Sequence, residues 1–250
     1  LDLKQAAQKG IICVNTPGVL EEAVAEYTMA LILSAARCLP RLNTEVRSGG
    51  WKPAVGTELC RKHLAVIGCG QIGRSVAKKA SAGFGMEVRG CKTTLAGADE
   101  LKRDYGFKEI VLDFEAAVDN ADFVSLHIPS TQATRRYINE GSLSSIPSKA
   151  WLINTARGAV VDENALYDAL KSGALRGAAL DVYENEPYKP LDPARDLRNL
   201  SNVIMTPHVA SSTVEACERV AERALRNISM AENGEFATMD ILNPEALHPE

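Results

Sequence analysis

The sequence predicts an α/β fold, a doubly wound parallel sheet covered by helices on both faces, and three observations lead to this prediction. Short apolar segments alternate with helix-length segments from residue 11 to about residue 206, as they do where crossover helices join parallel strands. One apolar segment, residues 64–67, runs directly into a glycine-rich turn that opens a helix. The 250 residues, 46% hydrophobic and 24% charged, suffice to bury one large core or two modest ones.

Each expected element follows from hydrophobic spacing and from the residues that begin and end it. Strands are expected at residues 11–14, 64–67, 86–91, 123–126, 151–154, 177–180 and 203–205, and helices at residues 1–10, 21–39, 74–83, 99–105, 114–118, 163–171 and 214–232. The helix from residue 21 has apolar residues at helical spacing and ends at Pro40. The last helix is amphipathic and stands apart from the alternation.

The glycine-rich turn indicates a bound dinucleotide. Residues 63–73 read HLAVIGCGQIG, which is a strand followed by the G-x-G-x-x-G pattern. Gly68 permits the tight turn, Gly70 lets the backbone approach a pyrophosphate, and Gly73 lets the new helix pack closely on its strand. The positive N-terminus of that helix would hold the phosphates. The flanking strand and helix favour a Rossmann cofactor site over an ordinary glycine-rich loop.

Composition excludes several classes of partner. A net charge of −4 leaves no basic surface for nucleic acid, and no apolar run approaches the ~20 residues that cross a bilayer. No metal site is expected either. The six cysteines form no C-x-x-C pair and stand at positions 13, 38, 60, 69, 91 and 217, mostly in apolar segments. This usage favours buried thiols in a reducing, cytoplasmic compartment, with only Cys69, in the glycine turn, exposed enough to react.

Four further motifs follow the glycine turn in a fixed order. They are VSLHIP at residues 124–129, WLINTARGAVVDE at 151–163, DVYENEP at 181–187 and TPHVA at 206–210. In these motifs the chain resembles the D-isomer-specific 2-hydroxyacid dehydrogenases over nearly its whole length. The resemblance implies an oxidoreductase that transfers a hydride between a nicotinamide cofactor and a small 2-oxo or 2-hydroxy acid. Glyoxylate, hydroxypyruvate and phosphoglycerate types all stay open.

Three side chains in these motifs suit that chemistry. Arg157 can clamp a substrate carboxylate and polarise its carbonyl with a planar guanidinium. His208 is the candidate proton donor, because an imidazole titrates near ~6.5 and such transfers contribute roughly 10²–10⁴-fold. Glu186 would keep that histidine protonated. His127 is expected to form a wall of the cofactor cleft rather than to donate a proton.

The cofactor-binding residues are expected in turns that follow strand ends. They are Gly68, Gly70, Gln71, Ile72, Gly73, Arg74, Lys92, Thr93, His127, Pro129, Thr155, Ala156 and Asp181. The place of Asp181 in its motif implies that it helps to seat the nicotinamide end, and the alternative is a cap at the end of a strand. His63 and His248 are expected to be ordinary surface or edge residues.

A lysine stands where an NAD-binding protein of this pattern has an acidic residue. An Asp or Glu about 20 residues after the glycine turn binds the ribose hydroxyls of NAD, and Lys92 occupies this place. A lysine cannot accept those hydrogen bonds, but it can pair with the 2′-phosphate of NADP at ~4 kcal/mol for unit charges ~4 Å apart. Arg74, Thr93 and Thr94 would add donors. NADP is therefore favoured and NAD stays possible, the alternative being that Lys92 points to solvent.

The domain organisation follows from the resemblance. Residues 1–18 would be the remnant of a second, flavodoxin-like substrate domain, residues 19–210 the Rossmann domain, and residues 211–250 a C-terminal helix and tail returning to the substrate domain. The chain opens with leucine, within a helical pattern, so it is expected to be truncated before the rest of that domain. The alternative to an enzyme is thus a truncated, non-catalytic dinucleotide-binding module or a cofactor-responsive scaffold.

A homodimer is expected from the helix that begins at residue 21 and the arm at residues 41–51. Both carry more apolar surface than the edge of a monomer needs, and isologous two-fold pairing is the commonest arrangement. The resemblance also implies pairing through the cofactor domains. The alternative is that this helix is covered by its own domain.

Overall fold

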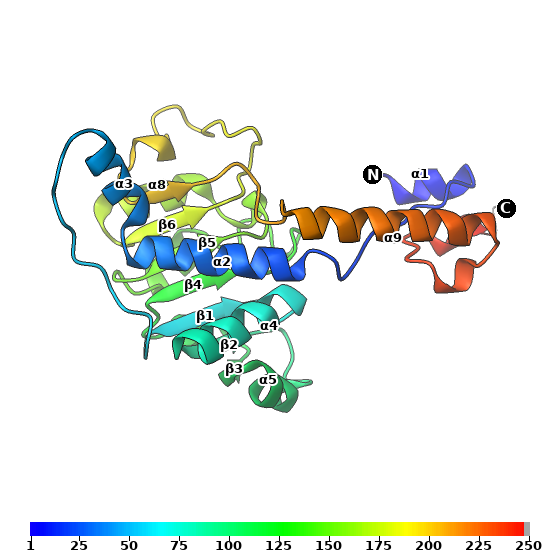
Figure 1. The fold of residues 1–250 in the computed structure, drawn as a ribbon, viewed down its shortest axis with the longest axis horizontal. Coiled ribbons are helices and arrows are strands. Elements are labelled where there is room, and N and C mark those ends of the chain that lie inside the picture. The colour runs from blue at the N-terminus through cyan, green and yellow to red at the C-terminus, as the bar shows by residue number, and fades with distance from the viewer. Residues whose placement is uncertain (248–250) are drawn as a thin grey trace. The chain divides into compact units, whose positions relative to one another are not determined.

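The computed structural model describes residues 1–247, which form two compact units: residues 24–210, and residues 1–23 together with the chain from residue 211 onward. His248 lies outside the described residues. In this part of the chain, the larger unit holds a seven-stranded sheet of order β3-β2-β1-β4-β5-β6-β7 with all neighbours parallel (Figure 1). Its strands are β1 (His63–Ile67), β2 (Glu87–Cys91), β3 (Phe107–Val111), β4 (Phe123–Leu126), β5 (Trp151–Asn154), β6 (Gly177–Leu180) and β7 (Val203–Met205).

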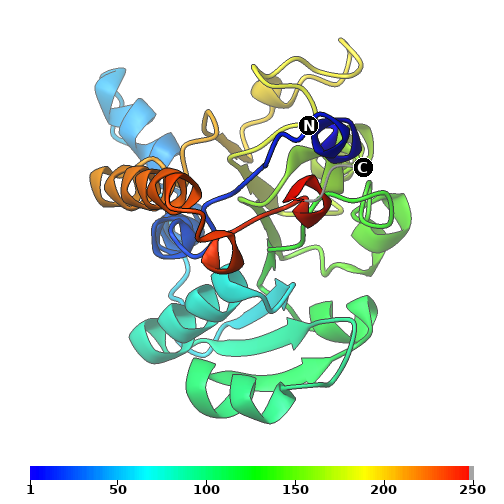
Figure 2. The same ribbon diagram turned by 90° about the vertical axis from the view of Figure 1, so that its right-hand side faces the viewer.

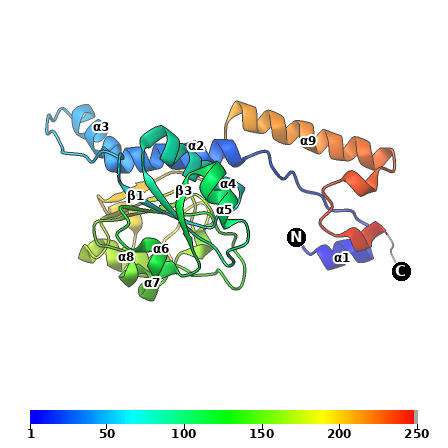
Figure 3. The same ribbon diagram turned by 90° about the horizontal axis from the view of Figure 1, so that it is seen from below.

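Helices cover both faces of this sheet, as Figure 3 shows. One face is packed by α2 (Glu21–Ala36), α4 (Gln71–Lys78) and α5 (Ala98–Tyr105), and the other by α6 (Phe114–Val118), α7 (Glu140–Ser145) and α8 (Glu163–Ser172), while α3 (Leu39–Arg47) follows α2. Successive side chains of β1 alternate between the two cores, because Leu64 and Val66 join one cluster and Ala65 and Ile67 the other. The predicted doubly wound α/β fold is confirmed.

The strand order creates the position of the site. From β1 the chain first builds β2 and β3 on one side, and then returns to place β4 on the other side of β1. In parallel sheets, ligands bind beyond the carboxyl ends of the strands at such a reversal. The ends of β1 and β4 are in register there, with Ile67 opposite Leu126. A crevice for a dinucleotide is therefore expected between these two strand ends.

The smaller unit joins the two ends of the described chain. It contains α1 (Leu3–Gln8) and α9 (Val214–Glu232), and a short 3-10 helix, Pro244–Leu247, lies beside α1 (Figure 2). The buried amide of Asn243 accepts from the backbone of Cys13 at 2.8 Å and donates to the carbonyl of Ile11 at 2.9 Å. Because Asn243 occupies these backbone groups, no strand forms at residues 11–14.

The prediction of a strand at residues 11–14 is thus wrong. This segment forms one antiparallel bridge, between Val14 and Ile241. The helix predicted over 21–39 ends at Ala36, because Cys38 has a left-handed backbone, φ 55°, and a new helix, α3, begins at Leu39 with Pro40 in its first turn. The helix predicted over 74–83 begins earlier, at Gln71, and its last five residues form a π-helical turn.

The sequence pattern missed β3 and α7. The central residues of β3, Lys108 and Glu109, are exposed because β3 is an edge strand, and edge strands commonly carry charged side chains. The missed strand therefore lacks the apolar run that marked the other strands.

The cysteines differ from expectation. Cys69 is 7% exposed, and burial raises the pKa of its thiol to about 12, so its predicted reactivity is wrong. Cys60 and Cys217 are exposed rather than buried. Glycine turns bring the backbone to the surface, but the side chain of Cys69 points back under the turn toward the carbonyl of Cys91, 3.6 Å away.

The α2 part of the dimer argument is also wrong, because α2 packs into its own unit through fully buried residues such as Ala25 and Ile32. The exposed apolar side chains of this region lie instead in α3 and the residues after it, so that the arm predicted at residues 41–51 extends over residues 39–55: Leu39, Val46, Trp51 and Val55. Among residues 1–247, none of the helices is both long and apolar enough to cross a membrane.

Candidate active site

The glycine turn has the geometry of a phosphate cradle. Gly68 has a φ of 98°, and a Cβ there would lie 2.5 Å from the carbonyl oxygen of His127. A Cβ on Gly73 would lie 2.1 Å from the carbonyl oxygen of Gly68, whereas Gly70 faces open space. The first turn of α4 has no side-chain cap, so its backbone N–H groups remain available to an anion. This arrangement fits the pyrophosphate of a dinucleotide.

The other predicted cofactor residues line the carboxyl edge of the sheet. Gly70 and Gln71 are exposed, Ile72 is half-buried against the core, and Pro129 is exposed after β4. His127 shares a 2.8 Å hydrogen bond with the hydroxyl of Ser125, and burial lowers the pKa of its ring to about 4. A neutral His127 agrees with its expected place in a wall and not in proton transfer.

Thr155 and Ala156 follow β5. The hydroxyl of Thr155 is buried and lies 2.9 Å from that of Thr28 in α2. Thr28 in turn donates to the carbonyl of Val24, so Thr155 is the donor of the pair. Its side chain therefore fixes α2 to the end of β5, and Ala156 beside it is half-buried.

Lys92 follows β2 directly, with Thr93 and Thr94 exposed beside it. Its ammonium donates to the carbonyl of Ala96 in its own loop, and an ammonium has two further protons to donate. Lys92 therefore does not point freely to solvent, and it can bind an anion without leaving its loop contact.

Arg74 points toward α5 from the first turns of α4. Its Nε donates to the carbonyl of Cys69 at 3.2 Å, its guanidinium lies 5.3 Å from the ring centre of Tyr105, and Glu100 is 3.5 Å away. These contacts engage Arg74 with the protein, so it is a weaker candidate donor to a phosphate than Lys92.

Asp181 at the end of β6 organises the loop that carries His208. It is fully buried, and its carboxylate accepts from the hydroxyl of Thr206 at 2.6 Å and from the backbone N–H groups of Val209 and Ala210 at 3.0 and 2.8 Å. Its carbonyl accepts from the N–H of His208 at 2.8 Å. Asp181 thus holds the His208 loop in place.

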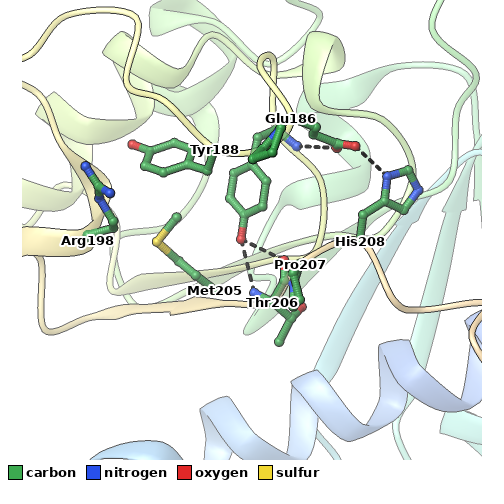
Figure 4. A pocket seen from close by; sticks show the side chains of 9 residues that line it. Glu186, Tyr188, Arg198, Met205, Thr206, Pro207 and His208 are labelled. Atoms are coloured by element: carbon green, nitrogen blue, oxygen red, sulfur yellow. Dashed lines mark hydrogen bonds and ion pairs between the residues drawn. The ribbon is translucent and has the colours of Figure 1, made fainter.

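Glu186 and His208 form a direct pair, which Figure 4 shows. The Nδ1 of His208 lies 2.6 Å from one oxygen of Glu186, and the other oxygen accepts from the N–H of Tyr183 at 3.0 Å. Burial opposes ionisation of Glu186, but these hydrogen bonds and the positive charge of Arg157 outweigh it and lower the pKa of the carboxyl. The contact uses Nδ1 of His208 and leaves its Nε2 available to a substrate.

Arg157 is exposed in a turn that Asn154 shapes. The buried amide of Asn154 donates to the carbonyl of Arg157 and accepts from the N–H of Ala156, both at 3.0 Å. The guanidinium also donates to the carbonyl of Ala156 at 2.6 Å. Arg157 lies near the pair, because the next residue, Gly158, packs directly on the backbone of Tyr183 and Glu184.

Two residues of this region were not singled out from the sequence. Asn154 shapes the Arg157 turn. The hydroxyl of Tyr183 joins two strand ends, because its oxygen lies 2.9 and 3.0 Å from the carbonyl oxygens of Leu180 and Thr206 and accepts from the N–H of Thr206 at 3.1 Å. Both stand inside the quoted motifs, and Asn154 is a polar residue at the end of an apolar strand. That pattern is the signal that could have found it.

A cavity of about 580 Å³ adjoins the pair. Its lining residues are Tyr183, Glu186, Pro187, Tyr188, Arg198, Met205, Thr206, Pro207 and His208. Arg198 is held by Asp196 at 2.6 Å and lies 5.5 Å from the ring centre of Tyr188. The cavity is within the size range of small-molecule sites. The Glu186–His208 pair lies at one end of it (Figure 4).

Comparison with known proteins decides the family. Residues 29–210 match the family model for the NAD-binding domain of the D-isomer specific 2-hydroxyacid dehydrogenases. The chain belongs to this family. A glyoxylate reductase of Korarchaeum cryptofilum is 38% identical over 256 residues, which cover 99% of this chain and 74% of that protein.

Solved structures of dehydrogenases and reductases match over most of the chain. The D-lactate dehydrogenase of Aquifex aeolicus, complexed with NAD and lactic acid, is 33% identical with a TM-score of 0.85, over 97% of this chain and 76% of that one. An NADPH-dependent glyoxylate/hydroxypyruvate reductase of Sinorhizobium meliloti is 31% identical with a TM-score of 0.82, over 98% and 75%. The predicted family, fold and general function, hydride transfer between a nicotinamide cofactor and a small 2-oxo or 2-hydroxy acid, are confirmed.

Proposed function

We propose that this dehydrogenase reduces glyoxylate or hydroxypyruvate with NADPH, and that Arg157, Glu186 and His208 act on the substrate side. The Glu186–His208 hydrogen bond of 2.6 Å carries the proposal, because a scaffold that only binds a dinucleotide needs no oriented proton donor. The names of the similar reductases support the substrate class.

Each residue would have a distinct task. Arg157 would bind the substrate carboxylate through its guanidinium and draw electron density from the adjacent carbonyl. His208 would donate the proton of Nε2 to the carbonyl oxygen, while Glu186 holds the ring through Nδ1 and stabilises its charge. The nicotinamide cofactor supplies the hydride when bound. The glycine turn and the loop around Lys92 would hold its phosphates.

The substrate class is tested by following the absorbance of NADPH and NADH at the reduced-nicotinamide band with glyoxylate, hydroxypyruvate and pyruvate in turn. Reduction of glyoxylate or hydroxypyruvate in preference to pyruvate supports the proposal. A chain that binds NADPH but reduces none of them would instead be a cofactor-binding module.

Replacing Lys92 is expected to reverse the cofactor preference. Lys92→Ala removes the cation at the end of β2, so KM for NADPH should rise by about 10-fold or more while KM for NADH changes little. The expected size follows from an attraction of a few kcal/mol between exposed charges, reduced by solvent screening. Steady-state kinetics with both cofactors measures the ratio.

Lys108→Ala is the control, because Lys108 is an exposed lysine on the neighbouring strand β3 with its ammonium paired to Glu87. It should leave the ratio unchanged. Equal changes of both KM values in Lys92→Ala would show that Lys92 does not recognise a 2′-phosphate.

We also propose a homodimer formed through the arm after α2. The exposed fractions of Trp51 and Val55 are 85% and 95%, and burying such side chains contributes roughly 1.5–3 kcal/mol each. Exposed apolar side chains that lie together commonly mark an interface.

The six free thiols favour a reducing, cytoplasmic compartment for this protein.

Replacing Trp51 by serine is expected to weaken dimerisation by about 10-fold or more, since a large apolar side chain would leave the interface. Sedimentation equilibrium from nanomolar to micromolar concentration measures this change. Leu112→Ser is the control, because Leu112 is also exposed, at 54%, but lies outside the arm. A wild-type chain that sediments as a monomer at micromolar concentration would contradict the dimer.

A further inference from the structure

Two segments that carry proposed active-site residues touch each other through their backbones. One is the Arg157 segment, which runs from Arg157 to Glu163 at the start of α8. The other is the turn at residues 183–186, which ends at Glu186. Between them, a Cβ on Gly158 would lie 1.8 Å from the carbonyl carbon of Tyr183 and 2.4 Å from the nitrogen of Glu184. Only glycine permits this approach, so the Arg157 segment lies directly on the Glu186 turn.

Glu163 ties the same two segments together by a hydrogen bond. It is 5% exposed, and one of its carboxylate oxygens accepts from the N–H of Glu184 at 2.6 Å. Glu163 is the first residue of α8, but the helix is capped by Asp162, which accepts from the N–H groups of Asn164 and Ala165. The carboxylate of Glu163 therefore serves the turn and not its own helix.

The turn presents two successive N–H groups to two carboxylates. The N–H of Tyr183 donates to Glu186 at 3.0 Å, and the next N–H, of Glu184, donates to Glu163. The peptide that joins them cannot rotate without breaking one of these bonds. A continuous set of contacts thus leads from Glu163 through the turn to Glu186 and on to His208.

The surroundings of Glu163 disfavour a buried, charged carboxylate at this position. Its second oxygen is buried and has no hydrogen-bond partner within residues 1–247, and the neighbouring carboxylates are those of Glu184 and Asp162. Arg135 pairs with Glu184 and Arg136 lies 3.7 Å from Asp162, so neither cation neutralises Glu163 directly. Burial first of all, and then these carboxylates, raise its pKa. A first helical residue does not require this burial, since Glu140 holds the same position in α7 and is exposed.

We propose that Glu163 is a positioning residue for the reaction: it fixes the turn at residues 183–186 against the Arg157 segment and thereby holds Glu186 on His208. The inference rests on the proposed roles of those three residues. Glu163 acts by accepting a hydrogen bond from the N–H of Glu184. Glutamine keeps an acceptor oxygen of the same reach and should therefore fulfil the same role.

Three variants test this role: Glu163→Ala, Glu163→Gln and, as matched control, Glu140→Ala. Glu163→Ala should lower kcat for glyoxylate reduction by about 10- to 100-fold, as misplacement of a reacting group does, with Kd for NADPH unchanged. The alkaline limb of its kcat–pH profile should move to lower pH, because a looser Glu186 stabilises the protonated histidine less. Glu163→Gln should restore both kcat and the limb, and Glu140→Ala should match the wild type.

Amide hydrogen exchange gives a second measurement that does not depend on activity. The N–H of Glu184 should exchange about 10-fold faster or more in Glu163→Ala, as expected when a hydrogen bond to a charged group is lost. If Glu163→Ala fails to fold, Glu163→Asp replaces it, because its shorter side chain cannot reach Glu184 and should show the same losses.

The outcomes separate the two proposals. An unchanged pH limb and unchanged exchange in Glu163→Ala or Glu163→Asp overturn the positioning role, and so does a Glu163→Gln variant as impaired as Glu163→Ala. A wild-type enzyme that reduces no 2-oxo acid overturns the proposed function instead, while exchange at Glu184 still decides whether Glu163 holds the turn.

Discussion

Replacing His208 by glutamine is expected to lower kcat for reduction by about 10²–10⁴-fold, the usual contribution of a general acid. Glutamine retains a polar side chain that can reach Glu186, but it carries no proton that titrates near neutral pH. NADPH binding should be unchanged, because the glycine turn follows β1 while His208 follows β7. Steady-state kinetics, with NADPH affinity from its fluorescence, separates the two effects.

His63→Gln is the control for this variant. His63 is a half-exposed histidine at the amino end of β1, 3.6 Å from Glu87, and its replacement should leave kcat unchanged. On the acid side the wild-type rate should persist below the ordinary glutamate range near ~4.3, because the pKa of Glu186 is lowered. A His208→Gln enzyme with wild-type kcat would show that another group supplies the proton.

Replacing Arg157 by glutamine is expected to lower kcat/KM by about 10²-fold or more. Two hydrogen bonds to a carboxylate would be lost, each contributing ~1.5–3 kcal/mol, and every 1.4 kcal/mol corresponds to about 10-fold. KM should rise because the substrate carboxylate loses its partner. Arg157→Lys should recover only part of the loss, since an ammonium cannot form the paired geometry of a guanidinium.

Arg176→Gln is the matched control, because Arg176 is an exposed arginine at the opposite, amino end of β6. Both enzymes are compared with glyoxylate and with its uncharged amide. Arg157→Gln should lose most of its preference for the acid over the amide, and Arg176→Gln should keep it. If Arg157→Gln retains the wild-type preference, another residue binds the carboxylate.

The apolar segments of the sequence already indicate which residues stand at the carboxyl ends of strands. In a parallel sheet these ends share one edge, so a residue that directly follows an apolar strand is placed there without knowledge of any contact. Gly68 and Lys92 were located in this way, and the family motifs added Arg157, Glu186 and His208. The fold class, the family and the general function were therefore available before any coordinates, while the roles of the individual residues stay predictions.

Which of these residues meet, and which are buried, depends on the tertiary structure. Glu186 and His208 are 22 positions apart in the sequence, and their 2.6 Å contact depends on the loop that Asp181 holds. Burial of the Cys69 side chain beneath an exposed turn, and the hydrogen bond that Glu163 accepts from a turn 21 positions away, follow from packing between segments distant in sequence. Local pattern fixes the position of a residue along its own strand or helix, but contacts between such elements depend on how their side chains pack.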